Sequence, residues 1–537
     1  MSRFLLSLAS LSAIVLAAVA NGADDVRPPR VQLGDESYSG AWHADSEVAV
    51  FRGIPFADPP VGELRWQRPQ PLQDKQPERS ATSFAPACMQ TTRILDWYRG
   101  LAETFGASRK VFDDLDVSED CLYLNIWTPD IESRNSLPVM VYIHGGSNNS
   151  GWSYEPNYHG HALAERGVIV VSIGYRLGVF GFFSHPELDS ANFGLWDQVA
   201  ALEWIQKNIG AFGGDPDRVT IFGESAGAQD ILALMASSRA DGLYHGAIMQ
   251  SNAGFGRRAS PTLPDEQQRG VDLAKTFGFE VDNALAELRA VPAAELLQHY
   301  SDQFPRYYHS PAIDGQLLTK SIWDVIIDNE LSPVPFIIGN NADEQYDSSD
   351  AEATPADIRK VLEGTQFQDS AEAFPAVISD PDPANAIDRI RTASGMQCPS
   401  QFLASHQTEL NNNGWVYYFS RVREGEAGAE VRAYHGAELP YVFGTHDPWM
   451  TTTDTDWQLA QQMMTYWVQF AKSGNPNADS LPYWPAFKSD NGKTMEFADK
   501  AVASSAQEPV LCRAFFAAVG GPEMANTTGT TANPDQQ

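Results

Sequence analysis

The sequence contains few basic residues. Its 537 residues include 37 Lys and Arg against 69 Asp and Glu, which gives a formal net charge of −32. A field of this sign repels phosphate backbones, so we expect no nucleic-acid partner. The apolar fraction of 43% is too high for a disordered chain, and the charged fraction of 20% is too high for a multi-span membrane protein.

Long apolar runs are also scarce. One lies at the N-terminus, where Arg3 precedes an apolar stretch from Phe4 to Ala17 and the small residues Ala18-Val19-Ala20. This pattern predicts a signal peptide over residues 1–22 and therefore an exported protein, either secreted or periplasmic. Serines interrupt the stretch and it is short for a membrane span, so we expect no integral membrane association.

Cysteine is rare, with four residues, and none of them forms a C-x-x-C motif. We therefore expect neither a zinc site nor a thioredoxin-like site. The pair His159-Gly160-His161 has no identifiable third ligand. No metal and no organic cofactor is implied. Pairing Cys88 with Cys121 and Cys398 with Cys512 is the simplest of the three possible connectivities.

The sequence has no internal repeat and no low-complexity linker before residue 525. We therefore expect a single domain over residues 23–524 and a disordered tail over residues 525–537. Short β-branched runs alternate with helical periodicity, which predicts an α/β fold with a mostly parallel central sheet flanked by helices. Residues 355–394 are typical of a helical, cap-like insertion. The predicted strands are Val139–Ile143, Val168–Ile173, Val219–Phe222, Val334–Ile338 and Gly414–Val422, and the predicted helices are Trp196–Ile209, Ala226–Met235 and Trp457–Phe470.

The pentapeptide Gly223-Glu224-Ser225-Ala226-Gly227 joins a predicted strand to a predicted helix. A serine at such a turn is held in a strained backbone with its hydroxyl at the helix N-terminus, and the flanking glycines avoid a clash. The pattern predicts Ser225 as the nucleophile of an α/β-hydrolase fold. Glu224 beside it could tune the pKa of a catalytic histidine or support the site through hydrogen bonds, and we favour support.

A nucleophilic serine needs a base, and in α/β-hydrolases the acid and then the histidine follow it along the chain. The acid is expected directly after a later strand, at Asp343 or Glu344. Among the histidines beyond this point, His406 lies in a helical pattern, whereas His435 lies in a loop beside a glycine. We favour His435 as the base and retain His446 as the alternative.

Backbone N–H groups are needed to bind the oxyanion of a tetrahedral intermediate. Ala226 supplies one such group because it directly follows the predicted nucleophile. The turn His144-Gly145-Gly146-Ser147 follows a predicted strand and can point further N–H groups at the same place. The sequence therefore predicts an oxyanion hole between these two segments.

Together these segments resemble the type-B carboxylesterases of the cholinesterase/carboxylesterase family of α/β-hydrolases. The resemblance covers nearly all of the mature chain and implies a triad of Ser225, Glu344 and His435, which favours the glutamate as the acid. The segments that carry it are Phe51–Phe56, Glu119–Ile126, Tyr175–Gly178, Phe212–Pro216, Gly223–Ala228, Ala342–Glu344 and His435–Pro440.

The resemblance also implies a set of supporting residues. The oxyanion donors would be Gly146, Ser147 and Ala226, and the hydroxyl of Ser251 would lie near the triad. The family pattern pairs Cys88 with Cys121 and Cys398 with Cys512, in agreement with the simplest connectivity.

Three positions depart from the family pattern. Family members usually carry HGGG or HGGA followed by an aromatic residue, whereas Ser147 and Asn148 stand here, which makes this wall polar. Gln345 replaces the glycine that normally follows the acid. Val111 stands at the position of the choline-binding tryptophan, so a cation–π choline site is not supported.

We therefore expect a secreted serine carboxylesterase that hydrolyses small-molecule carboxylic esters through an acyl-enzyme. Asn148 and the segment Tyr307-Tyr308-His309 are expected to line a polar acyl pocket that favours short or polar acyl groups. A cholinesterase- or lipase-type esterase is the alternative among enzymes. A non-catalytic, cholinesterase-like binding or adhesion protein is the alternative from another class, and the intact triad argues against it.

Overall fold

The computed structural model describes residues 27–520, except for residues 134–135, 253–259, 281–282, 306, 347–351, 368–373 and 490–491. The predicted signal peptide over residues 1–22 and the predicted tail over residues 525–537 lie outside the described residues. Among the helices that the structure describes, none is long and apolar enough to cross a membrane.

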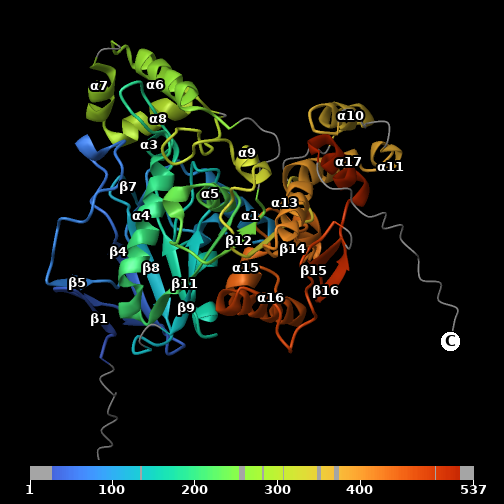
Figure 1. Ribbon diagram of the computed structural model, residues 1–537, viewed down its shortest axis with the longest axis horizontal. Coiled ribbons are helices and arrows are strands. Elements are labelled where there is room, and N and C mark those ends of the chain that lie inside the picture. Colours follow the sequence, from blue (N-terminus) through green and yellow to red (C-terminus); the bar gives the residue numbers. More distant parts are fainter. Residues whose placement is uncertain are drawn as a thin grey trace, which may run out of the picture.

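A large mixed sheet forms the centre of the molecule (Figure 1). Its strands are β3 (Ala41–Trp42), β4 (Ala49–Pro55), β8 (Tyr123–Thr128), β9 (Leu137–Ile143), β10 (Ile169–Ile173), β11 (Gly214–Glu224), β12 (Gly246–Gln250), β13 (Phe336–Asn341), β14 (Gly414–Phe419), β15 (Lys493–Phe497) and β16 (Ala501–Ser505). Smaller sheets contain β1 (Arg30–Leu33), β2 (Glu36–Ser39) and β5 (Glu78–Ser80), and β6 (Ala87–Cys88) with β7 (Val117–Ser118).

The strand order in the central sheet is β16-β15-β14-β13-β12-β11-β9-β10-β8-β4-β3. Neighbours from β15 to β10 pair in parallel, whereas β16 at one edge and β8, β4 and β3 at the other pair antiparallel. The prediction of a mostly parallel sheet is confirmed.

Helices cover both faces of the sheet (Figure 1). Their bounds are α1 (Arg93–Thr104), α2 (His161–Ala164), α3 (Gly178–Gly181), α4 (Phe193–Asn208), α5 (Ala226–Met235), α6 (Leu263–Phe277), α7 (Ala284–Ala290), α8 (Ala293–Gln303), α9 (Ile322–Ile327), α10 (Pro355–Glu363), α11 (Pro375–Ile378), α12 (Pro383–Thr392), α13 (Cys398–Glu409), α14 (Glu426–Val431), α15 (Leu439–Phe443), α16 (Asp454–Ser473) and α17 (Pro509–Val519).

Strand β9 shows why both faces need a cover. Val139 and Val141 point into one apolar cluster, together with residues of α4 and α5. Met140 and Tyr142 point into a second cluster, together with residues of α15 and α16. Because successive side chains of a strand alternate between faces, an unbroken apolar run requires helices on both sides.

Two groups of helices lie outside these layers (Figure 1). Residues 355–394 form α10, α11 and α12, which agrees with the predicted helical insertion. Helices α6, α7 and α8 form a second group, which the sequence did not predict. Their apolar residues pack in a separate cluster with Trp66 and Phe183, and the capping box of Thr262 and Asp265 marks the start of α6.

The structure contains both expected disulfides. Cys88 bonds Cys121 across 33 residues, and Cys398 bonds Cys512 across 114 residues. The first encloses the segment that carries α1, and the second joins α13 to α17.

Candidate active site

The segments with the predicted functional residues meet at one edge of the sheet. Ser225 directly follows β11, the oxyanion turn directly follows β9, and Glu344 lies three residues beyond β13. β9, β11, β12 and β13 are consecutive parallel strands, so their carboxyl ends lie side by side. This is the edge where α/β folds bind their ligands.

Ser225 occupies a strained turn between β11 and α5. Its φ of 56° and ψ of −121° lie outside the regions that most residues adopt. A Cβ on Gly223 would lie 2.5 Å from the carbonyl oxygen of Ile143, and a Cβ on Gly227 would collide with the same oxygen. The two flanking glycines are therefore required for β11 and α5 to approach β9.

Ser225, His435 and Glu344 form a hydrogen-bonded chain. The Nε2 atom of His435 lies 2.8 Å from the Oγ of Ser225, and its Nδ1 atom lies 2.5 Å from the Oε2 of Glu344. The other oxygen of Glu344 accepts a hydrogen bond of 2.6 Å from the backbone N–H of Asn341, at the end of β13. The carboxylate is thus fixed at both oxygens and can orient the imidazole.

The alternative residues lie elsewhere. His406 is on α13, with its Nε2 3.0 Å from the carbonyl oxygen of Ile326. The Nδ1 of His446 lies 2.9 Å from the guanidinium of Arg423. Asp343 accepts a 3.1 Å hydrogen bond from the backbone N–H of Ala433, so it holds the loop that carries His435 and does not contact the imidazole.

Glu224 places a second carboxylate against His435. Its Oε1 lies 3.2 Å from the Nε2 of His435, on the side of the ring that faces Ser225. Burial raises the pKa of Glu224. Burial by itself would lower the pKa of His435, but the charges of Glu224 and Glu344 outweigh it and raise that pKa. Glu224 therefore contacts the predicted base directly.

Several buried polar residues lie next to the triad. Glu438 accepts hydrogen bonds from Asn341 (2.6 Å) and Gln250 (2.8 Å). Ser251, which follows β12, is fully buried with a φ of 52°, and its backbone N–H donates to the carbonyl oxygen of Gly339. Within the described part of the chain, its hydroxyl makes no hydrogen bond to a triad residue.

The oxyanion turn has an unusual backbone. Gly146, Ser147 and Asn148 all have positive φ values, of 108°, 60° and 55°. A Cβ on Gly146 would collide with the carbonyl oxygen of Ser150, so only glycine fits there. Ala226 is the first residue of α5, where a backbone N–H has no partner within the helix. The turn and this helix end both border Ser225.

Asn148 anchors the turn to α5. Its side-chain Nδ2 donates a 3.1 Å hydrogen bond to Asp230, a buried residue of α5 that also accepts 2.6 Å from Gln198. The hydroxyl of Tyr175 donates to the Oδ1 of Asn148 (3.3 Å) and to the carbonyl oxygen of His144 (2.7 Å). Asn148 is fully buried, so it does not form the pocket wall that the sequence predicted.

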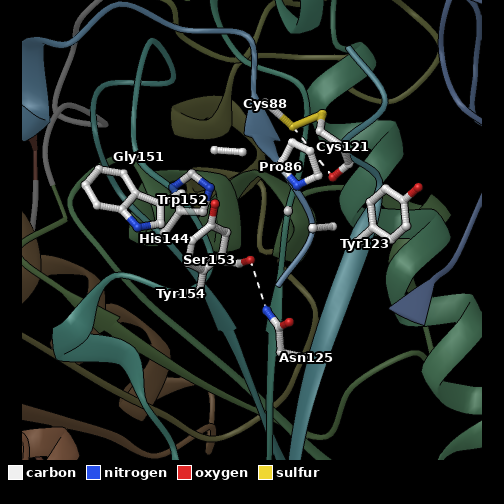
Figure 2. Close-up of a pocket in the computed structure, with 13 residues that line it drawn as sticks. Pro86, Cys88, Cys121, Tyr123, Asn125, His144, Gly151, Trp152, Ser153 and Tyr154 are labelled. Atoms are coloured by element: carbon white, nitrogen blue, oxygen red, sulfur yellow. Dashed lines mark hydrogen bonds between the residues drawn. A yellow bond between two sulfur atoms is a disulfide. The ribbon is translucent and has the colours of Figure 1, made fainter. Parts of the chain in front are cut away.

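The other end of the turn is held by the segment that follows Cys88. Gln90 donates to the carbonyl oxygen of Gly151 (2.7 Å) and accepts from its N–H (2.8 Å). A small cavity of about 10 Å³ lies between the Cys88–Cys121 disulfide, His144 and Trp152, and Figure 2 draws the residues that line it. The Cys88–Cys121 disulfide is therefore next to the oxyanion turn.

A pocket of about 270 Å³ opens onto Ser225. Its walls combine aromatic side chains with carboxylates and one arginine. The lining residues are Arg93, Ile94, Trp97, Tyr98, Gly145, Gly146, Ser147, Glu155, Asn157, Tyr158, Glu224, Ser225, Glu344, Gln345, Tyr434, His435, Gly436 and Leu439.

None of the four residues predicted for the acyl pocket lines this pocket. Asn148 faces Asp230, and the hydroxyl of Tyr307 donates to Glu266 (2.6 Å). His309 is buried against Tyr300, and Tyr308 is 64% exposed. Buried carboxyls draw Asn148 and Tyr307 away from this pocket, so it gives the predicted polar acyl walls no support. Four residues of the wall come instead from α1, which the sequence did not predict to take part: Arg93, Ile94, Trp97 and Tyr98.

The described residues contain no group of three or more His, Cys, Asp and Glu side chains that could hold a metal ion. The two histidines of the pair contact different partners. His159 packs on Phe84 and Trp127, and His161 stacks on His43.

Comparison with known proteins agrees with this geometry. Residues 36–511 match the family described as the Carboxylesterase family. The chain is 34% identical to the fumonisin B1 esterase of Sphingopyxis macrogoltabida, with 84% of each chain covered, and 34% identical to the para-nitrobenzyl esterase of Bacillus subtilis, with 84% of this chain and 91% of that protein covered.

A solved structure of a PNB esterase superposes with a TM-score of 0.78 at 31% identity, covering 91% of this chain and 99% of that one. The identity and coverage are high enough to show both the α/β-hydrolase fold and membership of the family. The chain belongs to the carboxylesterase family and is a carboxylic ester hydrolase of type B.

Proposed function

We propose that the protein hydrolyses esters through an acyl-enzyme on Ser225. His435 takes the proton of the serine hydroxyl as it attacks the ester carbonyl, and Glu344 holds the imidazole in the required orientation. The oxyanion is bound by the backbone N–H groups of Gly146, Ser147 and Ala226. His435 then protonates the leaving alcohol, and a water molecule repeats the sequence on the acyl-enzyme.

One observation carries this proposal: the chain of hydrogen bonds from Ser225 to His435 to Glu344, at 2.8 and 2.5 Å, opens into a pocket. The 2.8 Å between Ser225 and His435 is within the range that proton transfer needs. A non-catalytic binding protein has no use for a strained serine beside a buried His–Glu pair.

The substrate is a small ester, in our proposal, with a short or polar acyl group. The pocket of about 270 Å³ is slightly smaller than most ligand pockets, whose volumes run from about 300 to 1,000 Å³. Ser147 and Gln345 place polar groups in its walls. We also propose that the protein is exported, because its two disulfides require an oxidising compartment to form.

Ser225→Ala is the test. The variant should fold normally and lose activity on p-nitrophenyl acetate by a factor on the order of 10⁴–10⁶ in kcat, because the nucleophile is gone. Wild-type kcat/KM should be highest from acetyl to butyryl esters and fall toward octanoyl. A folded Ser225→Ala protein that retains more than a few per cent of the activity would refute the mechanism.

A further inference from the structure

Arg93 is a charged pocket residue that the proposed reaction does not use. It begins α1, is exposed, and lines the pocket that contains Ser225. Its Nη2 donates to the carbonyl oxygen of Gly146 (3.3 Å) and to the hydroxyl of Ser147 (3.1 Å). Both acceptors are uncharged. The nearby Arg99 and Arg109 form ion pairs with carboxylates, whereas Arg93 forms none within the described part of the chain.

The position of Arg93 relates it to the reacting carbonyl. Gly146 and Ser147 are two of the three proposed oxyanion donors, and the guanidinium contacts both residues. A substrate carbonyl group held by these donors would therefore lie close to the guanidinium, and a carboxylate a few bonds along the substrate could reach it. A guanidinium carries five N–H donors in a planar fork, so donors remain for a carboxylate.

The carboxylates of the pocket are already engaged. Glu344 and Glu224 face His435, and the Oε2 of Glu155 accepts a 2.6 Å hydrogen bond from Tyr98. Burial raises the pKa of Glu155. Arg93 is the one arginine or lysine among the described residues of the lining, so it is the fixed positive charge that this pocket offers to an anionic group of a substrate.

We propose that Arg93 is a specificity-determining residue that binds a carboxylate carried by the ester substrate, close to the scissile bond. The inference rests on the proposed function. The carboxylate belongs to the acyl half, as in a monoester of a dicarboxylic acid, or to the alcohol half, as in an ester of a hydroxy acid. The binding chemistry is the same in both cases: a charge-assisted, two-pronged hydrogen bond.

The experiment compares esters of matched shape. The acyl arm uses monoethyl succinate and its neutral isostere ethyl 4-oxopentanoate. The alcohol arm uses 3-acetoxypropanoate, neutral 4-acetoxy-2-butanone and cationic acetylcholine. Initial rates are followed by acid release for the wild type, Arg93→Gln and Arg93→Lys, with Ser225→Ala in parallel.

In at least one arm, Arg93→Gln should lower kcat/KM for the carboxylate ester by about 10- to 100-fold, as expected for a lost charged hydrogen bond, and leave the neutral isostere nearly unchanged. Arg93→Lys should restore part of the loss, because a point charge replaces the fork. Acetylcholine should be hydrolysed faster by Arg93→Gln than by the wild type. The arm that responds identifies the half of the ester that carries the carboxylate.

Arg109→Gln is the matched control. Arg109 lies in the same disulfide-enclosed segment, pairs with Asp96 and Glu103, and is absent from the pocket lining, so its loss should leave the ratio of carboxylate to neutral ester unchanged. Equal losses on both esters in Arg93→Gln would mean that Arg93 only supports the oxyanion turn, and would overturn the inference. Ser225-dependent turnover without an Arg93-dependent ratio overturns this inference alone, whereas turnover that survives in Ser225→Ala overturns the proposed function.

Discussion

Glu224 makes the imidazole of His435 a stronger base than the triad by itself would. A carboxylate 3.2 Å from Nε2 stabilises the imidazolium, and so does Glu344 at Nδ1. The base must be neutral to accept the proton of Ser225, so each added negative charge moves the pH at which the enzyme becomes active upward.

Glu224→Gln should therefore lower the pKa of His435. The acid limb of the pH profile of kcat/KM, which reports the protonation of the free base, should shift to lower pH. Glu155→Gln is the control, because Glu155 lines the same pocket but bonds Tyr98 instead of His435. An acid limb that stays in place in Glu224→Gln, or moves as far in Glu155→Gln, would contradict this role.

The neighbouring acids at the end of β13 have different tasks. Glu344 contacts the imidazole, whereas Asp343 binds the backbone of Ala433 and the guanidinium of Arg432. We expect Glu344→Gln to reduce kcat by about 10²-fold or more, because the amide no longer fixes the charge and tautomer of His435. Asp343→Asn should reduce it only slightly. Steady-state kinetics of the two purified variants decide, and the reverse ranking would assign the acid to Asp343.

At the scale of the element, the turn after β9 depends on a hydrogen bond to another element. Three consecutive residues with positive φ do not hold this shape unaided, and Asn148 ties them to Asp230 on α5, the helix that begins beside Ser225. The oxyanion donors of the turn and of α5 are thereby fixed relative to each other.

Asn148→Ala should lower kcat by about 10- to 100-fold with little change in KM, because donors displaced by even 1 Å bind the transition state poorly. Asn149→Ala provides the comparison: its side chain donates only to the carbonyl oxygen of Tyr307, and kcat should change much less. Equal kcat values for the two variants would show that the Asn148–Asp230 bond does not position the turn.

The sequence predicted those functional residues that lie close to the end of a strand. Ser225 and the oxyanion turn each follow a buried strand directly, and Glu344 lies three residues beyond another, so one pattern predicts both the strand and the functional residue near its end. His435 is different: it lies in a loop between α14 and α15, and the residues alone favoured it through that loop and the neighbouring Gly436 while keeping His446 as the alternative.

The walls of the pocket could not be predicted in this way. Arg93 and Trp97 reach Ser225 from α1, more than 100 residues earlier in the chain, and only the folded disulfide-enclosed segment brings them there. The sequence predicted Asn148 as a pocket residue because its partner Asp230 lies far along the chain, on α5. The ends of α16 were also missed, since the cap at Thr453 places its start three residues before the predicted one.

For the whole molecule, the two disulfides have unequal consequences. Each constrains the unfolded chain, at roughly 3–5 kcal/mol. The Cys398–Cys512 bond joins α13 to α17, and neither helix lines the pocket. The Cys88–Cys121 bond lies beside Gln90, which holds the oxyanion turn.

Replacing either pair with alanine should lower the free energy of unfolding, measured by denaturant titration. Only Cys88→Ala/Cys121→Ala should also lower the kcat of the folded protein. Thiol titration of the unfolded, unreduced wild type should detect no free thiol, since all four cysteines are bonded. A folded Cys88→Ala/Cys121→Ala protein with wild-type kcat would show that the oxyanion turn does not need this disulfide.

The disulfide-enclosed segment also has a consequence for how new activities arise. The proposed reaction centre is built on the edge of the sheet, whereas four residues of the pocket wall stand on α1, between Cys88 and Cys121. A covalent bond closes this segment at its base, and Gln90 within it holds the oxyanion turn, so a segment exchanged between relatives must keep that glutamine. Exchanging the residues of α1 that face the pocket is then a route to altering which esters are accepted while the chemistry is kept.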